Sequence, residues 1–132
     1  MLNKLLIPIV LVFATMANAG VELLSFRALP MVDHGRLEWS SGTETSFEAF
    51  IVERSPDGQN FLPIARVEGT GSFSEYSYTD SSPLDLDMDR SFYYRLKMLD
   101  DDGNYRYSET REVTLTFSAV QQTWGSIKAM FR

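Results

Sequence analysis

Apolar and polar side chains alternate along most of the chain from residue 20 onward. The clearest case is FYYRLKM at 92–98, in which every even-numbered side chain is bulky and apolar. Successive side chains of an extended strand point to opposite faces, so this two-residue period predicts a strand with one buried face and one wet face. Related strand-forming runs lie at 21–28, 36–41, 47–55, 61–69 and 74–80.

Turn-forming residues separate these runs. PDGQN at 56–60 is the strongest turn signal, because proline fixes φ and Asp-Gly suits positive φ. MVDHG at 31–35 also predicts a turn, and GTETS at 42–46 predicts a polar loop. Pro63 cannot donate to a β-ladder, which predicts an edge strand or a bulge there. About seven short strands over roughly 95 residues predict an all-β antiparallel sandwich.

The first 19 residues have the pattern of a signal peptide. Lys4 precedes an apolar run from Leu5 to Met16, and Ala17-Asn18-Ala19 has the small-x-small form that signal peptidases accept. The run is shorter than the about 20 apolar residues of a transmembrane helix. The sequence therefore predicts a signal peptide at 1–19 and a mature chain that begins at Gly20; the alternative is an uncleaved membrane anchor.

Charge and composition exclude several classes of function. The chain has 12 basic and 18 acidic residues and a formal net charge of −6, which becomes −7 without Lys4. Such a surface repels phosphate backbones, so we expect no nucleic-acid partner. There is no cysteine, which removes thiol catalysis and thiolate metal ligands from consideration. A small exported domain without disulfides must rely on its apolar core.

Spaced motifs together resemble a fibronectin type III domain. YYRLKMLDDDG at 93–103 resembles the F strand of that family with its following turn. LEWSS at 37–41 resembles the B strand, with Trp39 as the core tryptophan, and FEAFIVERSPDGQNFLPIARV at 47–67 is similar to strands C and C′ with their hairpin. The motifs are especially similar to modules of secreted Bacteroidetes proteins.

The resemblance covers residues 21–115. It implies a seven-stranded antiparallel fibronectin type III/immunoglobulin-like sandwich as the domain at 20–117, followed by a short C-terminal tail at 118–132. It also implies a bacterial source of the Bacteroidetes type, with the protein in the periplasm, at the cell surface or in the extracellular space.

The alignment also predicts which side chains of the F strand face the core. It turns Phe92, Tyr94, Leu96 and Met98 inward. Many family members have at the place of Phe92 the tyrosine of a tyrosine corner, whose hydroxyl bonds the backbone. Phe92 has no hydroxyl, so Tyr93 or Tyr94 takes that role if the register shifts.

Two aspartate-rich stretches are candidate calcium sites. Asp100, Asp102 and Asn104 have the one-apart spacing of a calcium loop, but Arg111 stands where the last acidic ligand belongs. The same residues suit a tight hairpin turn, which is the favoured interpretation. DLDMDR at 85–90 has three alternating aspartates that would share one side of an extended segment. The favoured interpretation of that stretch is a solvated loop.

We expect no enzyme activity, no catalytic residue and no cofactor. His34 is the only histidine, and it lies in a predicted turn between Asp33 and Gly35. Serine–histidine catalysis needs a nucleophile and an orienting acid beside the histidine. The sequence contains no G-x-S-x-G elbow, zinc spacing or phosphate loop. GTGS at 69–72 opens no predicted helix, so it does not form an anion cradle.

Several tyrosines are candidates for an exposed binding face. Exposed rings can stack on sugars or anchor protein interfaces, because tyrosine offers a large contact area at low entropy cost. The favoured alternative is packing between neighbouring strands. The candidates are Tyr76, Tyr78, Tyr93, Tyr105 and Tyr107.

The tail at 118–132 differs from the rest of the chain, because apolar residues recur there at helical spacing with cations between them. The candidate partner-binding residues are Trp124, Ile127, Lys128, Phe131 and Arg132. Such a segment suits docking into a groove, lying on an anionic membrane, or recognition by a sorting apparatus. The alternative is a tail that packs on its own domain or frays.

These observations predict a non-enzymatic exported interaction module that binds a protein partner. One alternative is a carbohydrate-binding module, which predicts coplanar exposed tyrosines. The other is a component or client of a bacterial secretion system that is recognised through its C-terminal tail. Membrane association is expected through the tail only.

Overall fold

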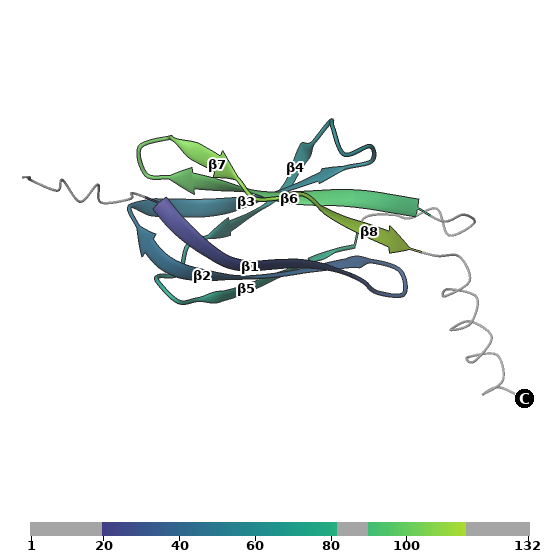
Figure 1. The fold of residues 1–132 in the computed structure, drawn as a ribbon, viewed down its shortest axis with the longest axis horizontal. Coiled ribbons are helices and arrows are strands. Elements are labelled where there is room, and N and C mark those ends of the chain that lie inside the picture. Colours follow the sequence, from purple (N-terminus) through teal and green to yellow (C-terminus); the bar gives the residue numbers. More distant parts are fainter. Residues whose placement is uncertain (1–19, 82–89, 116–132) are drawn as a thin grey trace, which may run out of the picture.

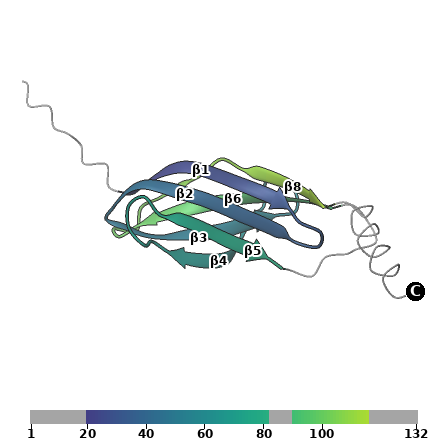
Figure 2. The ribbon, with the colours of Figure 1, turned by 90° about the horizontal axis from the view of Figure 1, so that it is seen from below.

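The computed structural model describes residues 20–81 and 90–115. They form two antiparallel sheets that pack face to face (Figures 1 and 2). The first sheet has the order β1 (Gly20–Pro30), β2 (Gly35–Thr45), β5 (Glu75–Asp80). The second has the order β4 (Leu62–Glu68), β3 (Phe47–Ser55), β6 (Arg90–Asp100), β7 (Tyr105–Tyr107), and β8 (Arg111–Leu115) also pairs with β6. The expected all-β sandwich of fibronectin type III-like fold is confirmed. Within these described ranges, no helix is long and apolar enough to span a membrane.

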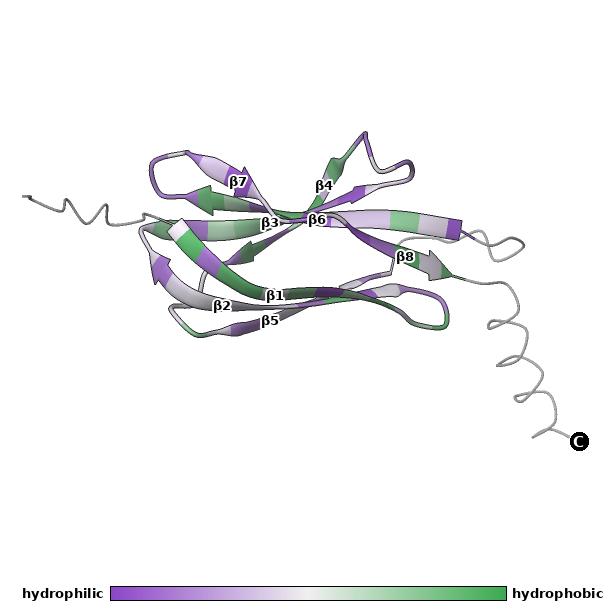
Figure 3. Ribbon diagram, in the orientation of Figure 1, coloured by the Kyte–Doolittle hydropathy of each residue, from purple (hydrophilic) through white to green (hydrophobic). Residues whose placement is uncertain are grey.

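The core lies between the two sheets, where the alternating pattern predicts it. Figure 3 shows hydrophobic and hydrophilic residues alternating along the strands. Trp39 lies edge-on to Phe50, with ring centroids 5.5 Å apart, and stacks on Tyr76 at 5.6 Å. Each such aromatic pair contributes about 0.5–1.5 kcal/mol beyond the area it buries. The buried cluster is Val21, Phe26, Leu37, Trp39, Phe50, Val52, Tyr76, Tyr94, Leu96, Met98, Val113 and Leu115.

The predicted polar loop at 42–46 is wrong over most of its length, because β2 continues to Thr45. Val21 pairs with Glu44 and Gly20 pairs with Thr45 across the β1–β2 ladder. The side chains of Ser41 and Glu44 bond to a neighbouring loop, whereas Thr43 and Thr45 are exposed. A prediction from composition alone therefore places the end of this strand too early.

The chain after the 100–104 turn forms two short strands, β7 and β8, which gives eight strands instead of the seven expected. Ser108 lies between β7 and β8, where its hydroxyl accepts the Leu96 amide at 2.8 Å. The Ser108 amide donates to the Leu96 carbonyl, also at 2.8 Å. The serine side chain thus takes the place of a backbone partner, and the ladder with β6 is interrupted only locally.

A charged clamp joins the two sheets at the end of β5. Arg54 of β3 donates through Nη1 to both carboxylate oxygens of Asp80, at 2.7 and 2.6 Å. The Tyr94 hydroxyl of β6 donates to Asp80 Oδ2 at 2.6 Å. Burial raises the pKa of Tyr94 above its usual value, and the bond to Asp80 raises it further. The Tyr94 hydroxyl thus bonds a side chain, whereas the hydroxyl of a tyrosine corner bonds the backbone.

Pro63 predicts an edge strand or a bulge, and the structure has both. Pro63 lies in β4, which is the edge strand next to β3. The β3–β4 register also shifts between Val52 and Glu53, which pair with Ala65 and Pro63. The missing amide donor therefore falls where the ladder is already irregular.

Candidate functional site

Part of the sequence prediction falls outside the described residues. The predicted partner-binding tail lies there, with Trp124, Ile127, Lys128, Phe131 and Arg132. The same holds for the alternating aspartates Asp85, Asp87 and Asp89. The roles of both segments stay predictions.

Residues 100–104 form the hairpin turn between β6 and β7 that DDDG predicts. Gly103 has φ of 88°, and its amide donates to the Asp100 carbonyl at 3.0 Å. The Asp102 carboxylate accepts the amide and the side-chain nitrogen of Asn104, both at 2.9 Å. Across residues 20–81 and 90–115, no three acidic or histidine side chains converge into a group that could hold a metal ion. The contacts at 102–104 are those of a turn.

His34 lies in the turn between β1 and β2. Its Nδ1 is 2.7 Å from Oδ1 of the exposed Asp33. The His34 carbonyl accepts the Met31 amide at 2.9 Å and closes the turn. These contacts give His34 a local structural role.

The outer face of the five-stranded sheet carries stacked cations and rings, which we call the cation–aromatic row. Its members are Phe61, Arg95, Lys97, Tyr105 and Tyr107. The Arg95 guanidinium lies between two rings, 4.1 Å from the Phe61 centroid and 3.8 Å from that of Tyr107. Arg95 Nε also donates to Oε1 of the buried Glu53 at 2.7 Å. The arginine thus has partners on both faces and at its edge.

The two tyrosines of the cation–aromatic row do not form a flat platform. Tyr105 and Tyr107 lie with ring centroids 5.4 Å apart and planes inclined at 69°. The Lys97 ammonium also lies 4.2 Å from the Tyr105 centroid. A sugar ring stacks best on coplanar rings with free faces, which this pair does not offer. The other candidate tyrosines are buried or half-buried: Tyr76, Tyr78 and Tyr93.

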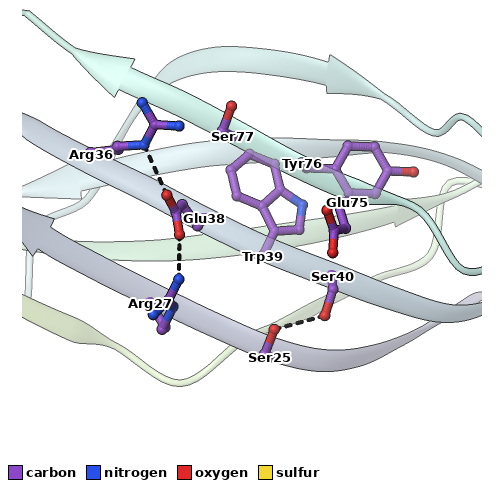
Figure 4. A pocket seen from close by; sticks show the side chains of 9 residues that line it. All are labelled: Ser25, Arg27, Arg36, Glu38, Trp39, Ser40, Glu75, Tyr76 and Ser77. Carbon is purple, nitrogen blue, oxygen red and sulfur yellow. Dashed lines mark hydrogen bonds and ion pairs between the residues drawn. The ribbon is translucent and has the colours of Figure 1, made fainter.

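A shallow depression of about 520 Å³ lies on the outer face of the three-stranded sheet (Figure 4). Its lining side chains are mostly polar: Ser25, Arg27, Arg36, Glu38, Ser40, Glu75 and Ser77, with Trp39 and Tyr76. Arg36 donates to Glu38 at 2.9 Å, and Arg27 also donates to it. The Arg36 hydrogen bond lowers the pKa of Glu38. Because Arg27, Arg36 and Glu38 pair with one another, the depression singles out no ligand.

Residues 69–74 connect β4 to β5, and we call them the Phe73 loop. The Phe73 amide donates to the Gly42 carbonyl at 2.7 Å. The Ser41 amide donates to the Ser74 carbonyl at 2.9 Å, and the Ser74 amide donates to Ser41 Oγ at 3.2 Å. These bonds extend the β2–β5 pairing into the loop and determine the position of its backbone.

Glu44 of β2 supports the Phe73 loop both directly and through Tyr76. Its Oε2 accepts the Ser41 hydroxyl at 2.6 Å and the Tyr76 hydroxyl at 2.7 Å. Its Oε1 accepts the Gly71 amide at 3.4 Å, and its own amide donates to Ser72 Oγ at 2.9 Å. Hydrogen bonds to an ionised acceptor are stronger than neutral ones. One carboxylate therefore holds the strand and the loop together.

Tyr76 connects this network to the core. Its ring stacks on Trp39 with the two planes inclined at only 10°. Its hydroxyl oxygen accepts the Thr70 amide at 2.9 Å and the Thr70 hydroxyl at 3.1 Å, while it donates to Glu44. The loop is thus fastened to the aromatic cluster of Trp39, Phe50 and Tyr76.

Phe73 is a strained and exposed residue on this well-fastened loop. Its φ is 59°, in the left-handed region, which costs a non-glycine residue about 1–2 kcal/mol. Its side chain is 75% exposed. The ring and cation–ring contacts found among the described residues do not include Phe73. Strained backbone of this kind collects at functional sites, so the Phe73 loop is the candidate site.

Phe73 is absent from the functional residues that the sequence predicts. The available signal is weak: one large apolar residue among the small polar residues of GTGSFS. The left-handed backbone leaves no trace in the sequence. The supporting Glu44 is 27 residues before Gly71 and 32 before Tyr76, so local patterns do not reveal the network.

Comparisons with known proteins bear on the fold. A scan against models of protein families finds no match, and a search of curated proteins finds none. A solved β-1,2-glucanase from Parabacteroides distasonis is 20% identical with a TM-score of 0.50; the match covers 74% of this chain and 12% of the glucanase chain. A solved Fn3-like protein from Clostridium thermocellum is 19% identical with a TM-score of 0.46, over 74% of this chain and 93% of that one.

At such identities, likeness to a solved structure concerns the fold alone. The glucanase match spans about an eighth of that enzyme's chain, and its activity is a property of that protein. The strand order is β1-β2-β5 against β4-β3-β6-β7, with β8 beside β6. The chain has the fold of a fibronectin type III-like β-sandwich.

Proposed function

We propose that this protein is a non-enzymatic exported interaction module that binds a protein partner through the Phe73 loop. The observation that carries the proposal is an aromatic side chain, 75% exposed, held at positive φ on a hydrogen-bonded loop. Large aromatic side chains that insert into a partner's pocket commonly dominate the binding energy of an interface. Phe73 is the described residue that best fits this role.

The construction of the loop supports this role. Glycine or asparagine would adopt the same backbone with less strain than phenylalanine. The aromatic side chain is therefore unfavourable for the isolated domain, which points to a benefit outside it. A loop that is already ordered before binding loses less conformational entropy when the partner arrives. Glu44 and Tyr76 supply that order.

Charge near the loop indicates the kind of partner. A Cβ at Gly42, whose carbonyl holds the Phe73 amide, would lie 2.7 Å from Glu22 Oε2. Glu75 follows the loop and is exposed, and the whole chain has a net charge of −6. We infer a partner with an apolar pocket and a basic rim, since complementary charge speeds encounter and rejects wrong partners.

Export and location are part of the proposal. The signal-peptide pattern of residues 1–19 supports export, and the resemblance to modules of secreted Bacteroidetes proteins supports the periplasm, cell surface or extracellular space. The tail at 118–132 is a separate candidate for the partner contact. Deleting the tail distinguishes binding by the tail from binding by the Phe73 loop.

The test is capture of envelope proteins by the tagged chain, quantified by mass spectrometry. Phe73→Asn removes the ring but suits the left-handed backbone. The matched control is Leu62→Asn, because Leu62 is 70% exposed and lies in β4. We expect a protein that the unmodified chain, the control and a chain lacking 119–132 all retain, and that Phe73→Asn loses at least tenfold. Equal retention by Phe73→Asn, or no retained protein at all, contradicts the proposal.

Affinity electrophoresis against a glycan panel addresses the carbohydrate-binding alternative. We expect no retardation, because the exposed tyrosine rings are not coplanar and each has a cation on one face. Retardation that Tyr107→Ala abolishes and Phe73→Asn leaves unchanged would favour the carbohydrate-binding function instead.

A further inference from the structure

We propose that removal of residues 1–19 creates a new ion pair, in which the freed α-amino group of Gly20 binds the buried carboxylate of Asp100 and locks the mature domain. The inference rests on the export proposed above. It gives the first residue after the predicted cleavage point a role in stability.

The Asp100 carboxylate can accept a further hydrogen bond. Asp100 ends β6, its side chain is buried, and Oδ1 has no hydrogen-bond partner within residues 20–81 and 90–115. An unpaired carboxylate oxygen away from water is unfavourable. Burial raises the pKa of Asp100; Arg106 opposes this shift, and Asp102 and Asp101 add to it. The site therefore favours one more hydrogen-bond donor or positive charge.

Gly20 lies directly against this carboxylate, at the end of the sandwich that carries the β6–β7 turn (Figure 1). A Cβ on Gly20 would be 3.0 Å from Asp100 Oδ1, 3.3 Å from Oδ2 and 3.0 Å from Arg106 Nη2. Gly20 is also buried, with φ of 121°. Its backbone nitrogen is about 2.5 Å from that Cβ position, hence within about 5.5 Å of Oδ1.

Cleavage changes the chemistry of this nitrogen. Hydrolysis of the Ala19–Gly20 peptide bond by a signal peptidase consumes one water. The water oxygen joins the Ala19 carbonyl carbon, which leaves as a carboxylate, and both water protons end on the Gly20 nitrogen. A neutral amide with one N–H thus becomes an ammonium with three donors. An ordinary α-amino group has a pKa of about 7.7–8.0, so it is mostly charged at neutral pH.

The neighbouring charges allow the added cation. Arg106 Nη2 donates to the Val21 carbonyl at 2.6 Å, so it is already held beside the site. Asp101 and Asp102 follow Asp100 in the turn and offset the second positive charge. The new ion pair joins the first residue of β1, in one sheet, to the last residue of β6, in the other.

The test compares two chains that differ only at the N-terminus: residues 20–132 with a free Gly20 amine, and residues 18–132, which keep Asn18-Ala19. Both contain the whole buried core from Val21 to Leu115. Each is made with Asp100 and with Asp100→Asn, and the four melting temperatures are measured at pH 6.5 and pH 10. N-terminal mass analysis of the exported full-length chain identifies its first residue.

We expect the chain that begins at Gly20 to melt about 4 °C higher at pH 6.5, with no difference in the Asp100→Asn pair. An ion pair raises the amino pKa in the folded state. The gain is therefore complete below the unfolded value of about 7.7 and is lost as the pH rises through the folded value, so it is absent at pH 10.

Equal melting temperatures at pH 6.5, or an equal difference in the Asp100→Asn pair, overturn the ion pair. An exported chain that begins at another residue overturns the cleavage point. Neither result affects the capture experiment with Phe73→Asn, so failure of the ion pair is distinguishable from failure of the proposed binding function.

Discussion

The Phe73 loop and the cation–aromatic row both expose aromatic rings to water, but the rings have different surroundings. In the row, Arg95 lies between Phe61 and Tyr107, and Lys97 lies over Tyr105. These rings contact cations that belong to the same sheet. Phe73 instead lies on a left-handed backbone with its side chain largely in water.

The difference shows that exposure alone does not identify a binding site. In the row, Tyr105 is 51% exposed and Tyr107 is 44% exposed. Both tyrosines nevertheless contribute to the fold through contacts inside the domain. Phe73 is exposed at a local conformational cost, and its ring makes none of the ring or cation–ring contacts found among the described residues. A partner is the simplest source of compensation.

Breaking the cation–aromatic row should give the largest effect on stability. Arg95→Ala leaves the buried Glu53 without its 2.7 Å partner. Because Arg95 is a quarter exposed, we expect a loss of about 2–3 kcal/mol, below the range for fully buried pairs. Urea unfolding measures the loss. The double variant Arg95→Met with Glu53→Leu is the control and should recover most of it; a loss below about 0.5 kcal/mol for Arg95→Ala, typical of surface pairs, would contradict a structural role.

Removing the support of the Phe73 loop should have the next largest effect. Glu44→Ala leaves the Ser41 and Tyr76 hydroxyls without their acceptor, at a cost of about 2 kcal/mol. Glu44→Gln keeps an acceptor oxygen and should lose less. Thermal melting gives the stability, and hydrogen exchange of residues 69–74 should quicken in Glu44→Ala. Unchanged exchange would mean that the carboxylate does not order the loop.

Phe73→Asn should stabilise the free domain. Asparagine tolerates the left-handed region better than phenylalanine, so we expect a gain of about 1 kcal/mol. The same substitution is expected to abolish partner capture, so stability and binding should move in opposite directions. A lower melting temperature for Phe73→Asn would show that the ring packs usefully within the domain and would remove the contrast between the two regions.

The smallest effect is expected for Tyr105→Ala. It removes the ring beneath Lys97 and the edge contact with Tyr107, and exposed cation–ring contacts contribute about 0.5–1 kcal/mol. Melting should therefore shift by a few degrees at most, and partner capture should not change. Loss of capture in Tyr105→Ala would move the binding site to the cation–aromatic row.

Much of the sandwich could be predicted because its information is local. The two-residue period at 92–98 marks the inward face of β6, and Tyr94, Leu96 and Met98 are buried as expected. Pro63 by itself predicts an irregular edge strand. Such signals arise from one residue or one strand, so a single sequence shows them directly.

The candidate site could not be predicted, because its determinants are far apart in the chain. The end of β2 is polar because Ser41 and Glu44 form hydrogen bonds with each other and with the loop before β5. This polarity resembles that of an ordinary loop. Phe73, whose φ is positive, bonds through its amide to the distant Gly42 carbonyl. The closeness of Gly20 to the Asp100 carboxylate likewise depends on strands brought together only by folding.

The clamp of Arg54, Asp80 and Tyr94 has a mechanical consequence. It fastens β5 to the opposite sheet at the end of that strand farther from Phe73. If a partner pulls on the Phe73 loop, the load passes along β5 toward the buried Asp80 carboxylate, whose hydrogen bonds are strengthened by the low local dielectric. The domain is thus suited to bear tension applied at the Phe73 loop without its two layers sliding apart.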